Sequence, residues 1–457
     1  MIQILKNGFW NLFGTVFIIL SGAILTLVAP KILTVEQFGL WRMFILYSTY
    51  AGILHLGVAD GYLLNNVSKS ISNAFNSLRR SMPFLIVQQI LISAIIYFIL
   101  LLYINDKQLL FIAASVLIFS ITINLRTLVD NFLIISKDFR RSNIVKIMEK
   151  ALFLLVLFAF LTFGKISYQL LIGLFIFASL SALIFLIILV KPKIELSKGI
   201  VKDNISDIKI GSQLLSSNIL IILLFNIDSV FVNMYLGIKS FAIFSFAITI
   251  IMLINQFAES ISQVLFPYLA TDLRNKLFSA NIMVVSGMFG LWVLILQFSF
   301  LFLPLINIVF PEYAESEMII FIYLITSLFT LIIRISQNNL FKVLNAQIVF
   351  VRIEVIVLLL LIVLLFIFNS NMSTTVISIL ILITRFVWFL MNEIYLKSDK
   401  RFLLKIVTGF LLYGGIYVSI YFYVENIYLR FILFTIIALP LYIVGFKNFY
   451  KKRKLSQ

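Results

Sequence analysis

The sequence predicts an all-α integral membrane protein that crosses the bilayer about fourteen times. Hydrophobic residues make up 62% of the 457 residues and charged residues only 12%, whereas about a quarter of a soluble domain is charged. Mean hydropathy is +1.12 over the whole chain. A water-soluble fold could not bury this much apolar surface, so the bilayer is the expected solvent throughout.

Fourteen apolar stretches have the length of a spanning helix, which needs about 20 residues. Helices are expected because backbone polar groups must be paired inside hydrocarbon, and the alternating pattern of a membrane barrel is not seen. The first stretch lacks a small-residue cleavage site and is expected to remain as the first span. The predicted spans are 6–29, 40–60, 82–104, 108–131, 147–164, 168–190, 208–236, 240–268, 281–304, 316–340, 350–368, 373–396, 403–423 and 428–446.

The composition excludes several kinds of chemistry. The chain has no Cys and a single His, His55, so disulfides, iron–sulfur clusters and His-rich metal sites are not expected. We predict no metal and no cofactor, apart from a coupling H⁺ or Na⁺. The Gly-x-Lys-Ser at 237–240 lacks the upstream glycine of an ATP-binding loop. No long extramembrane loop carries a catalytic constellation, so we expect that the protein is not an enzyme.

The net charge of +17 is distributed unequally between the two sides of the predicted bundle. Twenty-five Lys and Arg residues fall in one set of alternating loops and termini, and five in the other. Basic residues concentrate on the cytoplasmic side of membrane proteins. We therefore expect both termini in the cytoplasm and an even number of spans. Since the membrane explains the positive charge, no nucleic-acid partner is predicted.

The longest hydrophilic break separates six predicted spans from eight. We predict an N-terminal six-helix lobe over 1–190, a cytoplasmic linker over 191–207, a C-terminal six-helix lobe over 208–396, and two additional helices with a basic tail over 397–457. The turn 35–41 resembles the turn 238–244, and each opens an even-numbered helix. Two lobes with an even number of helices share one orientation, as in transporters built from parallel repeats.

Ionisable residues within the spans are the main functional candidates, because they are rare in hydrocarbon and usually face a bundle interior or an aqueous cavity. Arg126, Arg334 and Arg385 lie within predicted spans. A guanidinium stays charged and grips phosphate oxygens with paired donors, so these three are predicted to bind an anionic substrate. For Arg385, an interhelical ion pair with Glu259 or Glu393 is an equally open interpretation.

Two carboxylates are the candidates for ion coupling. Asp228 lies well inside the seventh predicted span, which has no basic residue near it, and Glu259 lies midway along the eighth. A buried carboxylate without a local partner requires a cavity, a proton or a distant cation. Asn255 and Gln256 extend the polar stripe around Glu259 and are further candidates for substrate binding.

Four other residues are secondary candidates, and each has a structural explanation. Arg42 lies near the outer end of its span and can reach the headgroups. His55 and Asp60 lie in the same span, where a hydrogen-bonded structural histidine is favoured over a proton relay. Asp130 lies four residues after Arg126, so the two share a helix face and can neutralise each other.

Two groups of residues carry a resemblance to a known family. The first group is APKIL at 29–33, EQFGLW at 36–41 and Leu-Gly at 56–57. The second is Asp228, YLG at 235–237, Phe244 and Phe-Pro at 266–267. Both resemble segments of the polysaccharide-transport branch of the multidrug/oligosaccharidyl-lipid/polysaccharide exporter superfamily, which contains the O-antigen and capsule repeat-unit flippases. Chain length and the grouping of six, six and two spans extend the resemblance over the whole chain.

The resemblance implies translocation of an undecaprenyl-pyrophosphate-linked oligosaccharide across the bacterial inner membrane by alternating access. The diphosphate would be bound by Arg385, Arg334 or Arg126, and Asp228 or Glu259 would take up the coupling ion. The implied partners are the lipid-linked oligosaccharide, membrane lipids, a polysaccharide polymerase and a chain-length regulator.

Three other readings stay open. A lipid II flippase and a multidrug exporter would share the superfamily and the fold, although a drug antiporter should favour acidic over basic cavity residues. A membrane-embedded polysaccharide polymerase or glycosyltransferase would also span the membrane many times. Such enzymes usually have a long external loop with catalytic residues, and the predicted external loops here are short.

Overall fold

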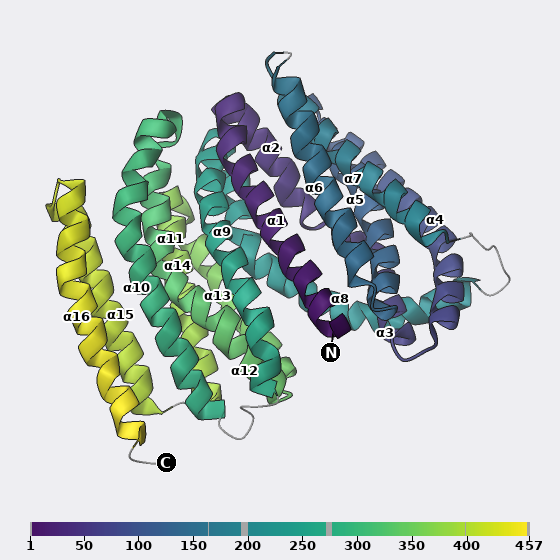
Figure 1. Cartoon of the computed structure of the whole chain (residues 1–457). Coiled ribbons are helices and arrows are strands. Elements are labelled where there is room, and N and C mark those ends of the chain that lie inside the picture. The colour runs from purple at the N-terminus through teal and green to yellow at the C-terminus, as the bar shows by residue number, and fades with distance from the viewer. Residues whose placement is uncertain (1, 163, 193–199, 271–276, 398, 455–457) are drawn as a thin grey trace. The chain divides into compact units, whose positions relative to one another are not determined.

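The structure, a computed structural model, describes residues 2–162, 164–192, 200–270, 277–397 and 399–454. Within these ranges the chain is helical and contains no strand, as Figure 1 shows. The α-helices are α1 (Ile2–Ile32), α2 (Val35–Ser48), α3 (Val58–Asn66), α4 (Ile71–Tyr103), α5 (Lys107–Ile135), α6 (Phe139–Leu161), α7 (Tyr168–Val190), α8 (Ile200–Tyr235), α9 (Gly237–Ala270), α10 (Leu277–Val309), α11 (Ser316–Leu331), α12 (Asn338–Val343), α13 (Gln347–Ile367), α14 (Thr374–Tyr395), α15 (Lys400–Tyr423) and α16 (Ile427–Lys454).

The sixteen described α-helices form fourteen helical stretches, which match the fourteen predicted spans in order. Two of the spans are each built from two helices, α2 with α3 and α11 with α12. Ten helices are long and apolar enough to cross a membrane by length and composition, and α1 and α16 contain shorter apolar segments. The predicted all-α membrane fold is confirmed.

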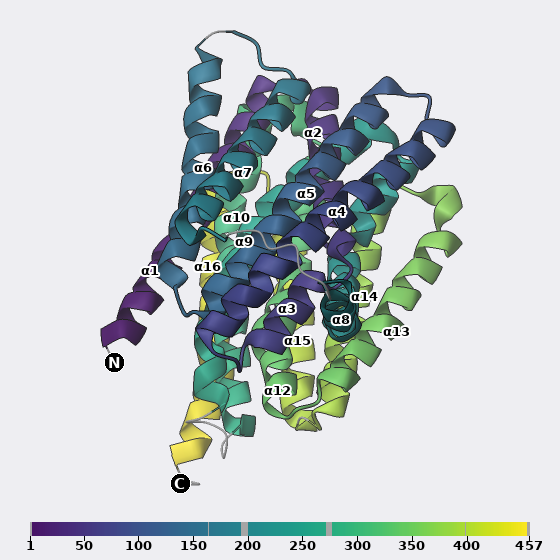
Figure 2. The ribbon, with the colours of Figure 1, turned by 90° about the vertical axis from the view of Figure 1, so that its right-hand side faces the viewer.

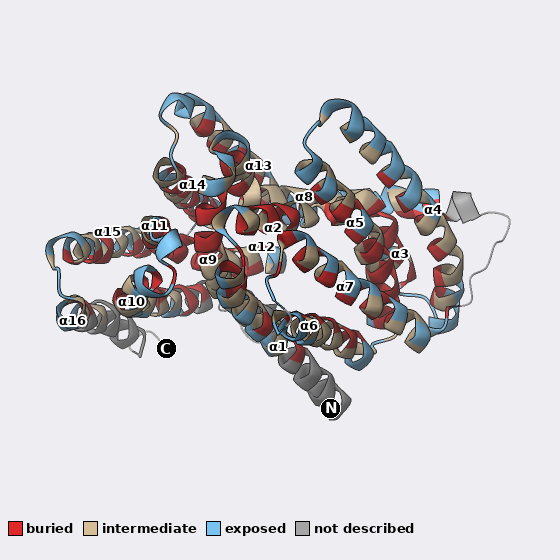
Figure 3. Cartoon of the chain, turned by 90° about the horizontal axis from the view of Figure 1, so that it is seen from above, coloured by how far each residue is buried: buried red, intermediate tan, exposed pale blue. Residues whose placement is uncertain are grey.

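The outer face of α4 shows why a membrane is needed. Only 17% of its most apolar window is buried inside the protein, and its exposed residues include Val87, Leu91, Ile95, Phe98 and Leu102. Pale blue exposed segments run along this helix in Figure 3. A continuous apolar face of this size would be strongly unfavourable in water, but it suits contact with lipid chains.

The described contacts divide the chain into two compact units, residues 1–242 and 243–457. In the first unit α4 packs on α5, α5 on α7, α7 on α6, and α6 on α1; Figure 2 views this unit from the side of α4 and α5. Its core is built from α3, α4, α5 and α7 around fully buried residues such as Val58, Leu78, Leu128 and Leu186.

In the second unit α10 packs against α11, α15 and α16, and α14 packs against α11 and α13. Aromatic residues fill this core, including the fully buried Trp292, whose Nε1–H donates to the backbone oxygen of Leu324 at 2.9 Å. The helix α8 packs against α3 and α4 within the first unit. The expected lobe boundaries at 190 and 208 stay a prediction.

Candidate functional site

The second predicted span is broken in the middle. Helix α2 ends at Ser48, a 3₁₀ turn covers Ala51–His55, and α3 starts at Val58. Leu56 and Gly57 link the pieces with φ angles of +51° and +91°, and the second of these is a conformation that glycine adopts without steric cost. Discontinuous spans often mark ligand or ion sites in transporters.

Two buried amides from other helices satisfy the backbone at this break. Gln89 of α4 donates from Nε2 to the oxygen of Leu54 at 2.7 Å. Asn124 of α5 donates from Nδ2 to the oxygen of Ala51 at 3.0 Å and to Gln89 Oε1 at 2.9 Å. Since an unpaired carbonyl is costly in hydrocarbon, these two side chains allow the span to be broken.

The break brings His55 and Asp60 together. The Nδ1 atom of His55 accepts a hydrogen bond from the backbone N–H of Gly57 at 2.9 Å, and its Nε2 lies 3.9 Å from Asp60 Oδ2. In the neutral imidazole the proton therefore sits on Nε2, on the side of the carboxylate. These contacts suit the structural role that the sequence favours for His55, and this role stays a prediction.

Charged residues of α5 and α6 form a second cluster. The Arg126 guanidinium pairs with Glu149, which also accepts from Lys150 Nζ at 3.3 Å. One turn away, Lys146 Nζ lies 3.2 Å from Asp130 Oδ2. Arg126 and Asp130 thus pair with α6 and not with each other, because the antiparallel α5–α6 hairpin sets opposite charges side by side.

This cluster borders a cavity of about 300 Å³. Arg126 and Glu149 are both buried, and Ile18, Phe119 and Phe175 form apolar parts of the lining. The ammonium of Lys150 lies over the ring of Phe175, 5.2 Å from its centroid. Positive charge at the wall of such a cavity could attract an anionic group, although the carboxylate of Glu149 offsets part of it.

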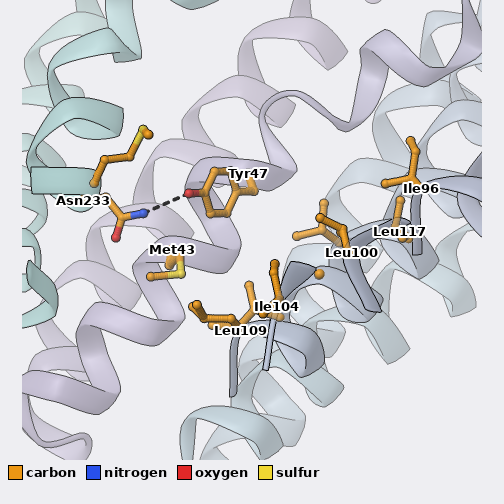
Figure 4. A pocket seen from close by; sticks show the side chains of 12 residues that line it. Met43, Tyr47, Ile96, Leu100, Ile104, Leu109, Leu117 and Asn233 are labelled. Carbon is orange, nitrogen blue, oxygen red and sulfur yellow. Dashed lines mark hydrogen bonds between the residues drawn. The ribbon is translucent and has the colours of Figure 1, made fainter. Parts of the chain in front are cut away.

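An apolar pocket of about 530 Å³ lies between α2, α4, α5 and α8 (Figure 4). Its wall is almost entirely aliphatic, including Ile96, Leu100 and Leu109. Tyr47 and Asn233 form a polar point at one side, where Asn233 Nδ2 donates to the Tyr47 hydroxyl at 3.0 Å. A wall of this kind suits a hydrocarbon chain.

Asp228 lies on α8, five residues before Asn233. It is buried, and the backbone N–H of Ser229 donates to its Oδ1 at 2.6 Å. Its charge acts on the hydroxyl of Tyr50 near the end of α2. The predicted ion-coupling carboxylate is therefore buried on α8, close enough to the broken span for its charge to act on Tyr50.

In the second unit, Arg385 is buried on α14. Its guanidinium lies over the ring of Trp388, 5.1 Å from the centroid, and its charge acts on the buried Glu354 of α13. Glu354 lies close to the start of α13. The antiparallel α13–α14 hairpin brings it to the level of Arg385.

Arg334 lies in a π-helical segment, Ile332–Gln337, that joins α11 to α12. Its backbone oxygen accepts from Ser262 Oγ at 3.0 Å. At the end of this segment the buried Gln337 donates to Glu393 Oε1 at 2.7 Å and accepts from Asn392 Nδ2 at 2.8 Å. Single π-helical turns are rare and often occur at functional sites.

The other predicted residues are placed separately. Arg42 is half-buried on α2. Asn255 is half-buried and Gln256 exposed on α9. The side chain of Glu259 lies outside the described residues. Among the described residues, no group of three or more His, Asp or Glu side chains could hold a metal ion.

Sequence reasoning missed the partners of Arg126 and Asp130 on α6 and the two amides at the break. Glu149 and Lys146 had a detectable signal: counted outward from the turn at 136–138, the charges of α5 and α6 are complementary at matching distances. Gln89 and Asn124 had none, because nothing in a continuous apolar stretch indicates that the backbone is broken at Ala51.

These observations define a multi-pass α-helical membrane protein with ionisable side chains buried between its helices. A family model described as "Polysaccharide biosynthesis protein" matches residues 4–272, more than half of the chain. The chain belongs to this family, which agrees with the resemblance of its sequence to the polysaccharide-transport branch of the exporter superfamily. No curated protein matches the sequence significantly.

Three solved structures illustrate the fold. The lipid II flippase MurJ in an inward closed conformation superposes with a TM-score of 0.72 at 15% identity, over 99% of this chain and 100% of MurJ. A multidrug resistance MATE family transporter of the MOP superfamily, inward-facing, gives 0.55 at 14% identity, over 84% of this chain and 94% of the other. A mutant of the Vibrio cholerae MATE transporter VcmN gives 0.51 at 14% identity, over 88% and 98%.

Proposed function

We propose that the protein is a flippase for undecaprenyl-pyrophosphate-linked oligosaccharide repeat units of an O-antigen, capsule or exopolysaccharide. It would move them from the cytoplasmic to the outer leaflet of the bacterial inner membrane by alternating access. Membership of the polysaccharide biosynthesis family carries the proposal. A transporter fold and buried cations within the spans support it, because a glycan diphosphate needs a polar path and a hydrocarbon tail does not.

The proposed substrate contacts are the three predicted arginines. Arg126 borders a cavity in the first unit. In the second unit Arg385 lies over the ring of Trp388 and its charge acts on Glu354, and Arg334 lies in the π-helical segment. Each guanidinium could exchange its present contacts for phosphate oxygens when substrate arrives. Asn255 and Gln256 are proposed to contact the sugars.

Ion coupling is proposed at Asp228 and Glu259, with H⁺ or Na⁺ as the ion. Asp228 sits beside the broken span, so a change in its charge would change the contact between α8 and α2. We expect Asp228→Asn to abolish the ion dependence of export while the protein still folds. Export measured against imposed pH and sodium gradients tests this, and an unaltered ion dependence rejects the role of Asp228.

On the outer leaflet the repeat units would pass to a polysaccharide polymerase and a chain-length regulator, which are the proposed partners. Both termini are proposed to lie in the cytoplasm, since the basic loops alternate with neutral or acidic ones. The two predicted six-helix lobes would supply the alternating movement.

The test is reconstitution of the full-length protein into liposomes that contain a lipid-linked oligosaccharide. We expect the protein to expose the oligosaccharide to a glycosidase or lectin added to the opposite side, without changing glycan length. Export of lipid II or of cationic drugs in preference would instead support the alternative transporters. Glycan lengthening would identify a polymerase and refute the proposal.

A deletion strain provides the cellular counterpart. Loss of the protein should leave lipid-linked repeat units accumulated on the cytoplasmic leaflet, and plasmid-borne wild type should clear them. If the repeat units reach the outer leaflet at the normal rate without the protein, it is not their flippase.

A further inference from the structure

A polar cavity lies at one end of the first unit, apart from all the sites described above. It has a volume of about 620 Å³, within the range of about 300–1,000 Å³ usual for small-molecule sites. Three helices contribute to it: the end of α3, the first turns of α4, and α8. The lining residues are Asn65, Asn66, Lys69, Asn73, Asn76, Ser77, Arg80, Ser206 and Asp207.

The floor of the cavity is held by close backbone packing of α3 against α8. A Cβ at Gly61 would collide with the backbone of Asp207, and one at Gly211 would collide with the backbone of Gly57. Such small-residue contacts let helices approach closely in membrane proteins. Asn65 follows Gly61 by one turn and donates from Nδ2 to Asp207 Oδ1 at 2.6 Å. The glycine contact therefore fixes this pair in place.

One face of α4 forms the opposite wall. Asn73, Asn76, Ser77 and Arg80 follow the i, i+3, i+4, i+7 spacing of a single helix face. The helix begins just beyond Ser70, whose Oγ accepts from the backbone N–H of Asn73 at 3.3 Å. A cluster of amides in this position does not stabilise the fold through burial, because Asn73 and Asn76 are exposed.

Two cations flank the amides. Lys69 Nζ donates to Asn66 Oδ1 at 3.3 Å, and Arg80 Nε donates to the backbone oxygen of Asn76 at 3.4 Å. Both cations belong to the basic set of loops that the charge count places in the cytoplasm. The third predicted span starts at residue 82, so the cavity lies at the edge of the membrane.

The cations, amides and carboxylate that line the cavity together restrict the chemical class of its ligand. Lys69 and Arg80 suit a phosphate, but a bare inorganic anion would be repelled by the buried carboxylate of Asp207 and would leave the amides unused. A neutral sugar would use the amides, which donate to and accept from hydroxyl groups, and Asp207, whose carboxylate accepts from them. It would not require the two cations. A glycosyl phosphate uses all of these groups at once.

We propose that this cavity is a docking site for a glycosyl phosphate, with the phosphate at Lys69 and Arg80 and the sugar against Asn65, Asn76 and Asp207. This inference rests on the proposed function for its most direct source, the glycan-diphosphate headgroup of the lipid-linked substrate before translocation. A soluble cytoplasmic glycosyl phosphate has the same chemistry and is the other source.

The experiment measures binding to the full-length protein in nanodiscs of zwitterionic lipid, so that anionic lipids do not compete. The soluble probes are α-glucosyl phosphate, glucose and inorganic phosphate, and the lipid probe is a polyprenyl-diphosphate-linked oligosaccharide. We expect α-glucosyl phosphate to bind more tightly than either glucose or phosphate. Arg80→Gln should weaken its binding about tenfold, the usual effect of losing a charge-assisted hydrogen bond.

Two further variants test whether a loss of binding arises in the cavity or from a change in the overall surface charge. Asn76→Glu changes an exposed residue, so folding is preserved. It should also weaken binding, because it removes an amide that contacts the sugar and places a negative charge next to Arg80, which competes with the phosphate for the guanidinium. Arg79→Gln removes an equal charge from the neighbouring position, which does not line the cavity, and should leave binding unchanged. Equal losses in Arg79→Gln and Arg80→Gln, or equal affinity for α-glucosyl phosphate and phosphate, would overturn the proposal.

The probes also distinguish the lipid-linked headgroup from a soluble glycosyl phosphate as the ligand. They test the docking site independently of the flippase function. Competition of the lipid-linked probe with α-glucosyl phosphate supports the headgroup as the ligand, and binding of the soluble probe alone supports the soluble source. Binding is measured without translocation. If Arg80→Gln and Asn76→Glu bind α-glucosyl phosphate as tightly as the wild type, the site is refuted, and flippase activity remains to be tested separately. Absence of translocation with intact, Arg80-dependent binding refutes the flippase and not the site.

Discussion

The buried ion pair between Arg126 and Glu149 makes the stability of the fold sensitive to the loss of either partner. Removing two charges from water costs several kcal/mol per ion, and only close pairing compensates for it. Glu149 has a second cation in Lys150, whereas among the described residues the ion pairs give Arg126 only Glu149. The two partners are therefore not equivalent, and a pair of single substitutions should show it.

We expect Glu149→Gln to destabilise the protein by about 3–5 kcal/mol, because it leaves the buried guanidinium without its carboxylate. Arg126→Gln should cost less, since Lys150 still neutralises Glu149. Reversible unfolding in detergent, followed as a double-mutant cycle, measures both values.

The control for this cycle is Lys146→Gln. Its ion pair with Asp130 is partly exposed, so the loss should stay within about 1 kcal/mol. Equal destabilisation by Arg126→Gln and Glu149→Gln would show that Lys150 does not neutralise Glu149.

At the scale of elements, the broken span α2–α3 depends on side chains from other helices. The carbonyl of Leu54 accepts from Gln89 and the carbonyl of Ala51 accepts from Asn124. The break places Gly57 and Gly61 where their backbones meet α8. A continuous helix would turn these residues to other faces.

We expect Gln89→Leu to destabilise the protein by about 1–3 kcal/mol, the cost of leaving a buried carbonyl without its donor. The neighbouring Gln88 provides a matched control, because the same substitution there should not destabilise the protein. Its Oε1 is buried without a hydrogen-bond partner among the described residues, so Gln88→Leu should be neutral or stabilising.

Thermal unfolding of both variants in the same detergent makes the comparison direct. If the two substitutions had the same effect, the hydrogen bond from Gln89 to the break would not stabilise the fold.

For the whole molecule, the orientation in the membrane determines what every site can do. The polar cavity can receive a cytoplasmic ligand only if the loop around Lys69 faces the cytoplasm, and the acidic turn around Glu312 must then face outside. The inequality of twenty-five basic residues against five predicts this orientation, which is open to direct measurement.

The chain contains no Cys, so single cysteines can be introduced without altering the background. We expect Ser68→Cys to be protected from a membrane-impermeant thiol reagent in intact cells and to react after permeabilisation. Glu315→Cys and Glu425→Cys, both at exposed positions, should react in intact cells. The unsubstituted protein is the control, and the reverse labelling pattern would invert the proposed topology.

The sequence predicted the number and order of the helical stretches. It also predicted which ionisable residues lie within them. A span requires a minimum apolar length, which adds up along the chain, and a charged residue is placed in a span by its position alone. For this reason all fourteen predicted spans have a counterpart among the helices.

Only the tertiary structure decided which groups meet. Arg126 pairs with Glu149, Arg385 lies near Glu354, and Asn65 meets Asp207 from a segment 142 residues away. These contacts depend on the register between helices and on how closely their backbones approach, and no single stretch of sequence contains that information. The break in the second span has the same origin, since the donors that stabilise it lie on α4 and α5.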